Sequence, residues 1–258
     1  MTAFYGNTTN LQEIKLLAKS LLYMEPELTE YSPVVIHHPF TTSGIVGLKD
    51  AEGKLRLGNI VENEEDRKQW HRQMQGIIDG CGSALRVYSL IEKQYALGFL
   101  KHAAPSLSRA DYSVILADAW IRSENPNNDP NLSRGKLLSM FKAADQTVLM
   151  NADERARLDE LGETVTVYRG VRSSRPGSVK ALSWTLDREI AQWFAERYGR
   201  NGTVYEAKIE KKHIHALFLG RNESEVILNP EYLTDITHMH SMAQGEMKIE
   251  PSPEIGGM

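Results

Sequence analysis

Hydrophobic residues recur every three or four positions through much of the first 150 residues, which is the period of an α-helix with one buried face. The first such stretch follows Thr9, a candidate helix cap, and ends before Pro26. A second begins after Asn63, where acidic residues suit the positive end of the helix dipole, and is broken at Gly80. Further helices are expected at about residues 84–103, 109–122 and 133–150.

Three short apolar runs interrupt this helical pattern and favour strands. They lie at residues 34–36, 45–46 and 55–60. A turn at residues 50–53 would join the last two runs as a hairpin. Residues 1–150 are therefore predicted to form a mostly helical region with a small β element.

From Gly162 onward the hydrophobic period changes to two, which is typical of half-buried strands. A helix capped by Asp187 is expected among these strands, and a capping box at Asn151 and Glu154 predicts another helix just before Gly162. Strands are expected at residues 164–168, 181–185, 204–209, 214–218 and 226–228.

The sequence thus predicts an α+β protein in three parts. A mostly helical region at 1–150 is followed by a strand-rich domain at 151–240 and by a tail at 241–258. The tail is rich in Met, Gly and Pro, so we expect it to be partly flexible. A chain of 258 residues, of which 41% are hydrophobic, is long enough to bury a sizeable core.

Charge and cysteine content narrow the functional classes. The formal net charge is −4, which disfavours a nucleic-acid binder that relies on phosphate neutralisation. Cys81 is the only cysteine, so no intramolecular disulfide can form, and this suits a reducing compartment. We see neither a secretory signal pattern nor an apolar run of transmembrane length, so we expect a soluble cytoplasmic protein without a membrane partner.

The histidines do not predict a metal site. Each of them lacks a nearby acidic or histidine partner that would complete a ligand set at a metal-site spacing, so no metal is expected. The histidines considered are His37, His38, His71 and the pairs His213/His215 and His238/His240.

Two carboxylates, Glu223 and Glu225, stand two residues apart between a turn at Gly220 and an apolar run. In an extended backbone, residues i and i+2 point to the same face, so their side chains would project side by side. Like charges that close are unfavourable unless the site gains from them. The pair is therefore a candidate functional site.

Three short motifs, each at a predicted strand, precede or include this pair. They are Tyr168-Arg169-Gly170, Ser183-Trp184-Thr185 and Glu223-Ser224-Glu225. Their order resembles the Arg-Ser-Glu class of mono-ADP-ribosyltransferases, the bacterial toxin and vertebrate ecto-enzyme families that split NAD and transfer ADP-ribose to a protein. The resemblance covers about residues 160–232, and the whole chain is similar in appearance to bacteriophage or prophage proteins. It implies a two-sheet, split β-sandwich domain that acts, if phage-encoded, in the host cytoplasm.

The resemblance assigns five residues to binding of NAD, which is the donor substrate; one of them, Thr185, would support the site. Arg169 would bind the phosphates, because a guanidinium matches phosphate oxygens, and Gly170 would allow close approach of the nicotinamide amide. Phe194 would lie against the nicotinamide ring, and Arg197 would be a second phosphate ligand. The structural alternatives are a surface arginine, a turn glycine, a helix-core phenylalanine and a solvated helix charge.

The remaining implied residues act at the reacting centre. Glu225 would accept a hydrogen bond from the ribose 2′-hydroxyl and stabilise the positive charge that develops as nicotinamide leaves. Ser183 would hold Glu225, with Thr185 in support; both are also ordinary strand residues. Glu223 would orient an attacking guanidinium, which implies an arginine acceptor. Trp184 departs from the small residue usual in the family, and we expect it to point into the core.

Two other functions remain open. The same fold could act as an NAD glycohydrolase with water as the acceptor, or it could be an inactive NAD-fold module whose helical part binds a partner. The presence of Arg169, Ser183 and Glu225 argues against the inactive module. A nucleic-acid acceptor is disfavoured by the net charge and by Glu223.

Overall fold

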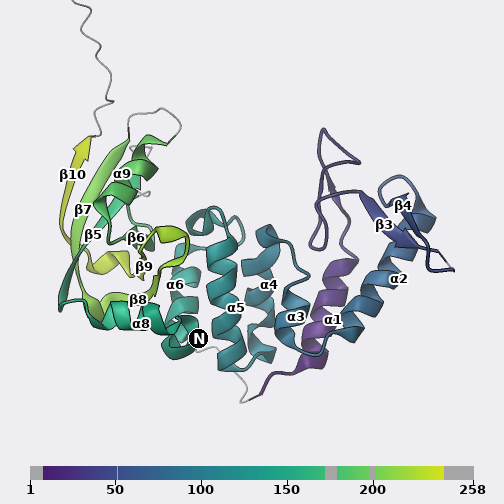
Figure 1. Cartoon of the computed structure of the whole chain (residues 1–258), viewed down its shortest axis with the longest axis horizontal. Helices are drawn as coiled ribbons and strands as arrows, with labels where there is room; N and C mark the ends of the chain where they lie inside the picture. The colour runs from purple at the N-terminus through teal and green to yellow at the C-terminus, as the bar shows by residue number, and fades with distance from the viewer. Residues whose placement is uncertain (1–7, 51, 172–178, 198–201, 241–258) are drawn as a thin grey trace, which may run out of the picture. The chain divides into compact units, whose positions relative to one another are not determined.

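The computed structural model describes residues 8–50, 52–171, 179–197 and 202–240, so the tail predicted at 241–258 lies outside the described residues. The chain divides into two compact units. Figure 1 shows the elements of the described residues, coloured by residue number from purple to yellow. The first unit takes in residues up to 160 together with 215–220, and the second takes in 161–214 and the residues from 221 onward. The fold class is α+β, as the sequence predicts.

The first unit is mostly helical, as expected. Its helices are α1 (Leu11–Leu22), α2 (Glu64–Gly80), α3 (Ala84–Tyr88), α4 (Ala96–Ala103), α5 (Arg109–Arg122), α6 (Arg134–Ala143), α7 (Gln146–Leu149) and α8 (Ala152–Asp159). Helix α8 belongs to this unit, so the boundary along the chain falls at residue 160, whereas the sequence analysis placed it at 150. Among the described residues, no helix is long and apolar enough to cross a membrane.

Three details of the helix prediction are wrong for local reasons. The cap of α1 is Asn10, whose side chain accepts from the Glu13 amide at 3.3 Å, because the Thr9 hydroxyl is engaged with Asp111. The helix expected at 84–103 is divided into α3 and α4 by a 3₁₀ turn at Lys93–Tyr95. The helix expected at 133–150 is divided before Asp145, which caps α7.

An aromatic cluster in the core of the first unit includes Trp120 of α5. Trp120 and Phe141 meet edge to face with centroids 4.9 Å apart, an orientation that aromatic quadrupoles favour. Phe218 lies 6.5 Å beyond Phe141. Glu154, which completes the predicted capping box of α8, also accepts from the Leu219 amide at 3.0 Å. One buried carboxylate therefore ties residues 215–220 to the helical unit.

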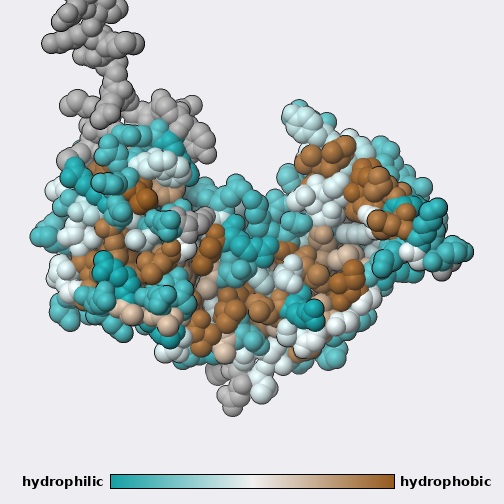
Figure 2. Space-filling model, viewed as in Figure 1, coloured by the Kyte–Doolittle hydropathy of each residue, from teal (hydrophilic) through white to brown (hydrophobic). Residues whose placement is uncertain are grey.

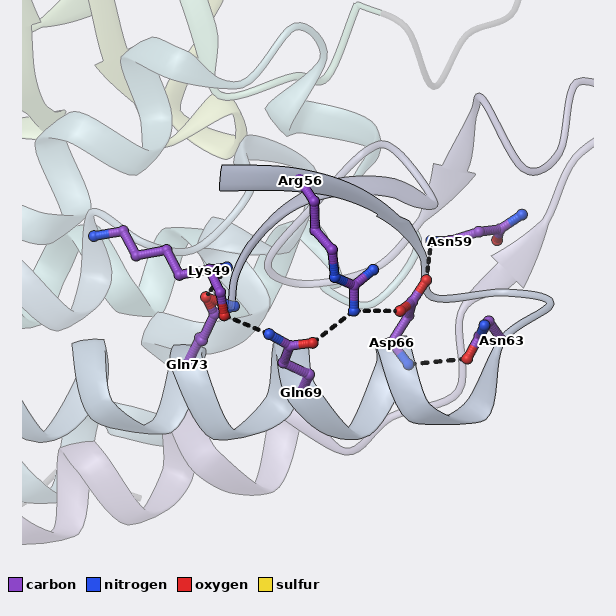
Figure 3. A network of polar contacts seen from close by, with 7 residues as sticks. All are labelled: Lys49, Arg56, Asn59, Asn63, Asp66, Gln69 and Gln73. Atoms are coloured by element: carbon purple, nitrogen blue, oxygen red, sulfur yellow. Dashed lines mark hydrogen bonds and ion pairs between the residues drawn. The ribbon is translucent and has the colours of Figure 1, made fainter. Parts of the chain in front are cut away.

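A small hairpin is fastened to α2 by polar side chains (Figure 3). It consists of β3 (Ile45–Lys49) and β4 (Leu55–Asn59), which pair in antiparallel fashion as predicted. Asp66 accepts from the Asn59 amide at 2.8 Å and from Arg56 at 2.7 Å, and Gln73 accepts from the Lys49 amide at 2.9 Å. Figure 2 shows hydrophobic side chains at the surface over this hairpin, where Leu55 and Leu57 are exposed. A second pair of short strands, β1 (Glu27–Leu28) and β2 (Ile36–His37), lies nearby in sequence.

The remaining strands form a six-stranded sheet of order β10-β7-β5-β6-β9-β8. Its register is continuous over eight residue pairs between β5 and β7, but among the described residues β5 and β6 share only the pair Tyr168–Thr185. The sheet is thus nearly divided between β5 and β6. The strands are β5 (Thr164–Val171), β6 (Ser183–Thr185), β7 (Thr203–Glu210), β8 (Ile214–Phe218), β9 (Glu225–Leu228) and β10 (Thr234–His240).

Strand β10 is an edge strand that the sequence analysis missed. Its described side chains at residues 234–238 are exposed, so it lacks the apolar alternation that marks a half-buried strand. It pairs with β7 through Thr237–Glu206 and its neighbours, with a register shift between Thr234 and Thr237. Backbone pairing and polar side-chain contacts, such as the Lys208–Asp235 ion pair, therefore define this strand, and neither leaves a hydrophobic signal.

His38 is a fully buried histidine in the first unit. Its Nδ1 accepts from the Phe40 amide at 3.1 Å, and its ring meets Trp70 edge to face with centroids 5.1 Å apart. Burial lowers the pKa of His38 from its ordinary 6.5 to about 4, because the charged imidazolium would lose its hydration. The side chain is therefore neutral at physiological pH, consistent with a core role.

We expect the first unit to lose stability as the pH falls from about 6.5 to 4. In this window the unfolded state binds a proton at His38 that the folded state does not, so the free energy of unfolding falls by roughly 3 kcal/mol. Urea unfolding as a function of pH measures this. A His38→Asn variant, which keeps a neutral acceptor, should flatten the dependence; an unchanged slope in the variant would contradict the assignment.

Candidate functional site

The three motifs meet where β5, β6 and β9 lie next to one another in the second unit. Tyr168 of β5 pairs with Thr185 of β6, and Thr185 pairs in turn with Glu225 of β9. β6 is three residues long, and side chains alternate along a strand. Ser183 and Thr185 therefore lie on one face and Trp184 on the other. Residues that are far apart in the sequence thus become neighbours in the sheet.

A hydrogen bond joins Ser183 and Glu225. The Ser183 hydroxyl donates to Glu225 Oε1 at 2.5 Å, and the Glu225 side chain is buried, with 8% of the residue exposed. The Arg169 guanidinium donates from Nη1 to the main-chain carbonyl of Ser183. The structure therefore brings together Arg169, Ser183 and Glu225, and the contact between Ser183 and Glu225 that the sequence analysis expected is present.

Glu223 lies outside the strand that holds Glu225. β9 begins at Glu225, and both Asn222 and Ser224 have positive φ angles, 56° and 43°. The backbone between the two carboxylates is therefore a left-handed turn, so the expectation that they project side by side from an extended strand is wrong. The sequence has no glycine at these positions to reveal the turn.

The Thr185 side chain holds the main chain of this turn. The buried Thr185 hydroxyl donates to the Glu223 carbonyl at 2.6 Å and accepts from the Asp187 amide at 3.0 Å. The Leu186 amide also donates to the Ser224 carbonyl, at 3.1 Å. The sequence analysis assigned Thr185 to support of the site. It did not predict the hydrogen bond from Thr185 to the Glu223 main chain, because no sequence pattern indicates that bond.

Helix α9 (Arg188–Glu196) packs on β5 and β7, as Figure 1 shows. Asp187 caps it as predicted, accepting from the Glu189 and Ile190 amides at 2.8 and 3.3 Å. A Cβ on Gly170 would lie 1.9 Å from the Ala191 carbonyl oxygen, and one on Gly202 would lie 2.2 Å from that of Ala195. The two glycines therefore let the helix backbone touch the sheet.

Phe194 and Arg197 meet each other at the C-terminal end of α9. The Arg197 guanidinium carbon lies 4.7 Å from the Phe194 ring centroid, which is cation–π distance, and both residues are half-buried. Trp193, which packs edge to face against Phe194, is 56% exposed. This arrangement provides an aromatic surface and a cation close together, and their predicted roles toward NAD stay predictions.

Trp184 lies in β6 and Gly170 lies in β5, the strands that carry two of the motifs. Trp184 points into the core as expected, with 2% of the residue exposed and its indole N–H donating to the Ala181 carbonyl at 3.1 Å. Gly170 lies within β5 under α9, so helix packing alone requires a glycine there. Within the described ranges, no group of three or more His, Cys, Asp or Glu residues could hold a metal ion.

A Gly170→Ala substitution should destabilise the second unit by roughly 2–4 kcal/mol, because the new methyl group would overlap the α9 backbone. Thermal and urea unfolding measure the loss. Gly162→Ala is the matched control, since a Cβ there lies 3.9 Å from its nearest neighbour and should be tolerated. A Gly170→Ala protein as stable as the parent would show that α9 does not pack this closely.

The interpretation of this site depends on its own geometry and motif order. No protein-family model, curated protein or solved structure matches the chain. What connects Arg169, Ser183 and Glu225 is their order in the sequence and the hydrogen bonds that join them.

Proposed function

We propose that the chain is an NAD-dependent mono-ADP-ribosyltransferase that transfers ADP-ribose from NAD to an arginine side chain of a protein and releases nicotinamide. The observation that supports this proposal most is the hydrogen bond from Ser183 to the buried Glu225. This bond orients one carboxylate oxygen of Glu225, and the Ser183 carbonyl accepts from Arg169 of the neighbouring strand β5. The three residues follow one another in the sequence in the order that the family resemblance implies. A carboxylate held in this way suits chemistry that develops positive charge.

Glu225 is the residue that we place nearest the reacting carbon. Cleavage of the bond between nicotinamide and ribose passes through an oxocarbenium-like state, with positive charge on the ribose ring. Nicotinamide leaves as a neutral molecule and needs no proton. A preoriented, poorly solvated carboxylate stabilises such a cation better than water does, because it needs no reorganisation during the reaction. Ser183 supplies that orientation.

The donor side of the proposed site has two cationic residues. Arg169 is oriented by the Ser183 carbonyl, and Arg197 stands at the end of α9 beside Phe194. Guanidinium groups bind phosphate oxygens with matched geometry, and an aromatic ring can stack on nicotinamide. We assign the two arginines to the pyrophosphate and Phe194 to the ring.

The near-division of the sheet supports a two-sheet domain of the transferase type. Strands β10, β7 and β5 form one three-stranded part, and β6, β9 and β8 form the other. In the part of the chain that the structure describes, a single residue pair joins β5 and β6. Arg169 lies on one part, whereas Ser183 and Glu225 lie on the other. A substrate bound at this junction would contact both.

Replacing Glu225 by Gln should lower NAD cleavage by about 10²- to 10³-fold, because the amide keeps the shape and the hydrogen bond but loses the negative charge. Release of nicotinamide from NAD, followed by chromatography, measures this. The control is Glu210→Gln, which removes a carboxylate that is exposed and paired with Lys212 at 2.6 Å. Full activity of Glu225→Gln would show that the reacting centre lies elsewhere.

Replacing Glu223 by Gln should reduce transfer to arginine more than it reduces hydrolysis of NAD, because Glu223 is assigned to the incoming guanidinium and not to the leaving group. The measurement compares labelled ADP-ribose attached to agmatine with free labelled ADP-ribose in the same reaction. Equal loss of both products would contradict this division between the two carboxylates. A parent protein that makes only free ADP-ribose would instead be an NAD glycohydrolase.

A further inference from the structure

We infer that Thr185 is a positioning residue that sets how much ADP-ribose goes to arginine and how much to water. It does so by fixing the main chain of Glu223 and linking it to α9. The inference rests on the proposed function and adds to it a residue that controls the fate of the product. Thr185 need not touch NAD to have this effect.

Both hydrogen-bonding directions of the Thr185 hydroxyl are used within the protein. Its proton goes to the Glu223 carbonyl at 2.6 Å, and its oxygen accepts from the Asp187 amide at 3.0 Å. The residue is 6% exposed, so water has little access to replace either bond. A single hydroxyl therefore joins the turn that carries Glu223 to the residue that caps α9.

The turn around Glu223 needs such an external support. Asn222 and Ser224 both have left-handed backbone conformations, which non-glycine residues adopt at a conformational cost and keep only where their surroundings hold them. Two contacts from β6 and the residue after it hold the turn, namely the Thr185 hydroxyl and the Leu186 amide. Loss of the Thr185 hydroxyl removes the hydrogen bond to the Glu223 carbonyl, whereas the Leu186 amide still holds the Ser224 carbonyl at 3.1 Å.

Glu225 is held by different contacts. Its side chain accepts from Ser183, and its main chain belongs to the β6–β9 ladder through the pair with Thr185. Removal of the Thr185 hydroxyl changes neither of these, because ladder bonds involve only backbone atoms. Different hydroxyls therefore reach the two carboxylate residues: Ser183 donates to the Glu225 side chain, and Thr185 donates to the Glu223 main chain.

The same hydroxyl reaches the donor side of the proposed site. Asp187, whose amide donates to Thr185, caps α9 through its side chain, and α9 carries Phe194 and Arg197. The position of Glu223 is thus linked to the helix that would bind nicotinamide and phosphate. A site arranged in this way keeps the acceptor carboxylate aligned with bound NAD.

The test is Thr185→Val, which keeps the β-branched shape and removes the hydroxyl. Purified parent and variant are given NAD labelled in its adenosine part, with agmatine as the guanidine acceptor. We expect the ratio of labelled agmatine to free ADP-ribose to fall about tenfold in the variant, because loss of one buried hydrogen bond is worth about that factor. Thr185→Ser, which restores the hydroxyl, should recover most of the ratio.

A matched control is Thr234→Val, because Thr234 also donates its hydroxyl to a main-chain carbonyl, that of Lys208, at 3.4 Å in the same sheet. Its product ratio should stay at the parent value. If Thr185→Val proves too unstable to assay, Thr185→Ala removes the same hydroxyl without adding a methyl group, and the same fall in ratio is expected.

Three results would overturn the inference. Parallel loss of transfer and hydrolysis in Thr185→Val, with the ratio unchanged, would show that Thr185 acts on stability alone. Failure of Thr185→Ser to restore the ratio would show that the hydroxyl is not the relevant group. A parent protein that cleaves NAD but labels no agmatine would remove the arginine acceptor, whereas one that does not cleave NAD at all would refute the proposed function itself.

Discussion

The arrangement of the second unit depends on burying one carboxylate. Glu225 begins β9 with little exposure to solvent, and a buried charge is strongly unfavourable unless hydrogen bonds replace its hydration. The Ser183 hydroxyl supplies one such bond. Ser183 can donate this bond because β6 lies between β5 and β9 in the sheet. The short strand β6 therefore lowers the free-energy cost of burying the Glu225 carboxylate.

Around that carboxylate, close backbone contacts fix the other candidate residues. Gly170 and Gly202 bring α9 against the sheet, and Asp187 starts the helix directly after β6. This docking places Phe194 and Arg197 at the C-terminal end of α9, where the Arg197 guanidinium lies over the Phe194 ring. Two glycines and one helix cap therefore set the position of α9, and the rigid helix sets the positions of the candidate residues at its end.

The sequence predicts the parts of this arrangement that leave a local pattern. Helix period, capping residues and strand alternation predict α2, α5, α9 and most strands, and the order of Arg169, Ser183 and Glu225 predicts which residues meet. The sequence does not predict the left-handed turn at Ser224, because a serine gives no indication of a positive φ angle. Strand β10 escapes because its exposed residues show no apolar alternation. The sequence does not predict the breaks in the two divided helices, because no proline or glycine marks them.

The most direct test of the proposed activity uses NAD labelled in its phosphates, the purified chain and a mixture of cell-lysate proteins, followed by mass spectrometry of labelled peptides. The proposal predicts ADP-ribose on arginine side chains together with release of an equal amount of nicotinamide. Label that appears only as free ADP-ribose would contradict transfer, and NAD that stays intact would contradict the assignment of the Arg169–Ser183–Glu225 site.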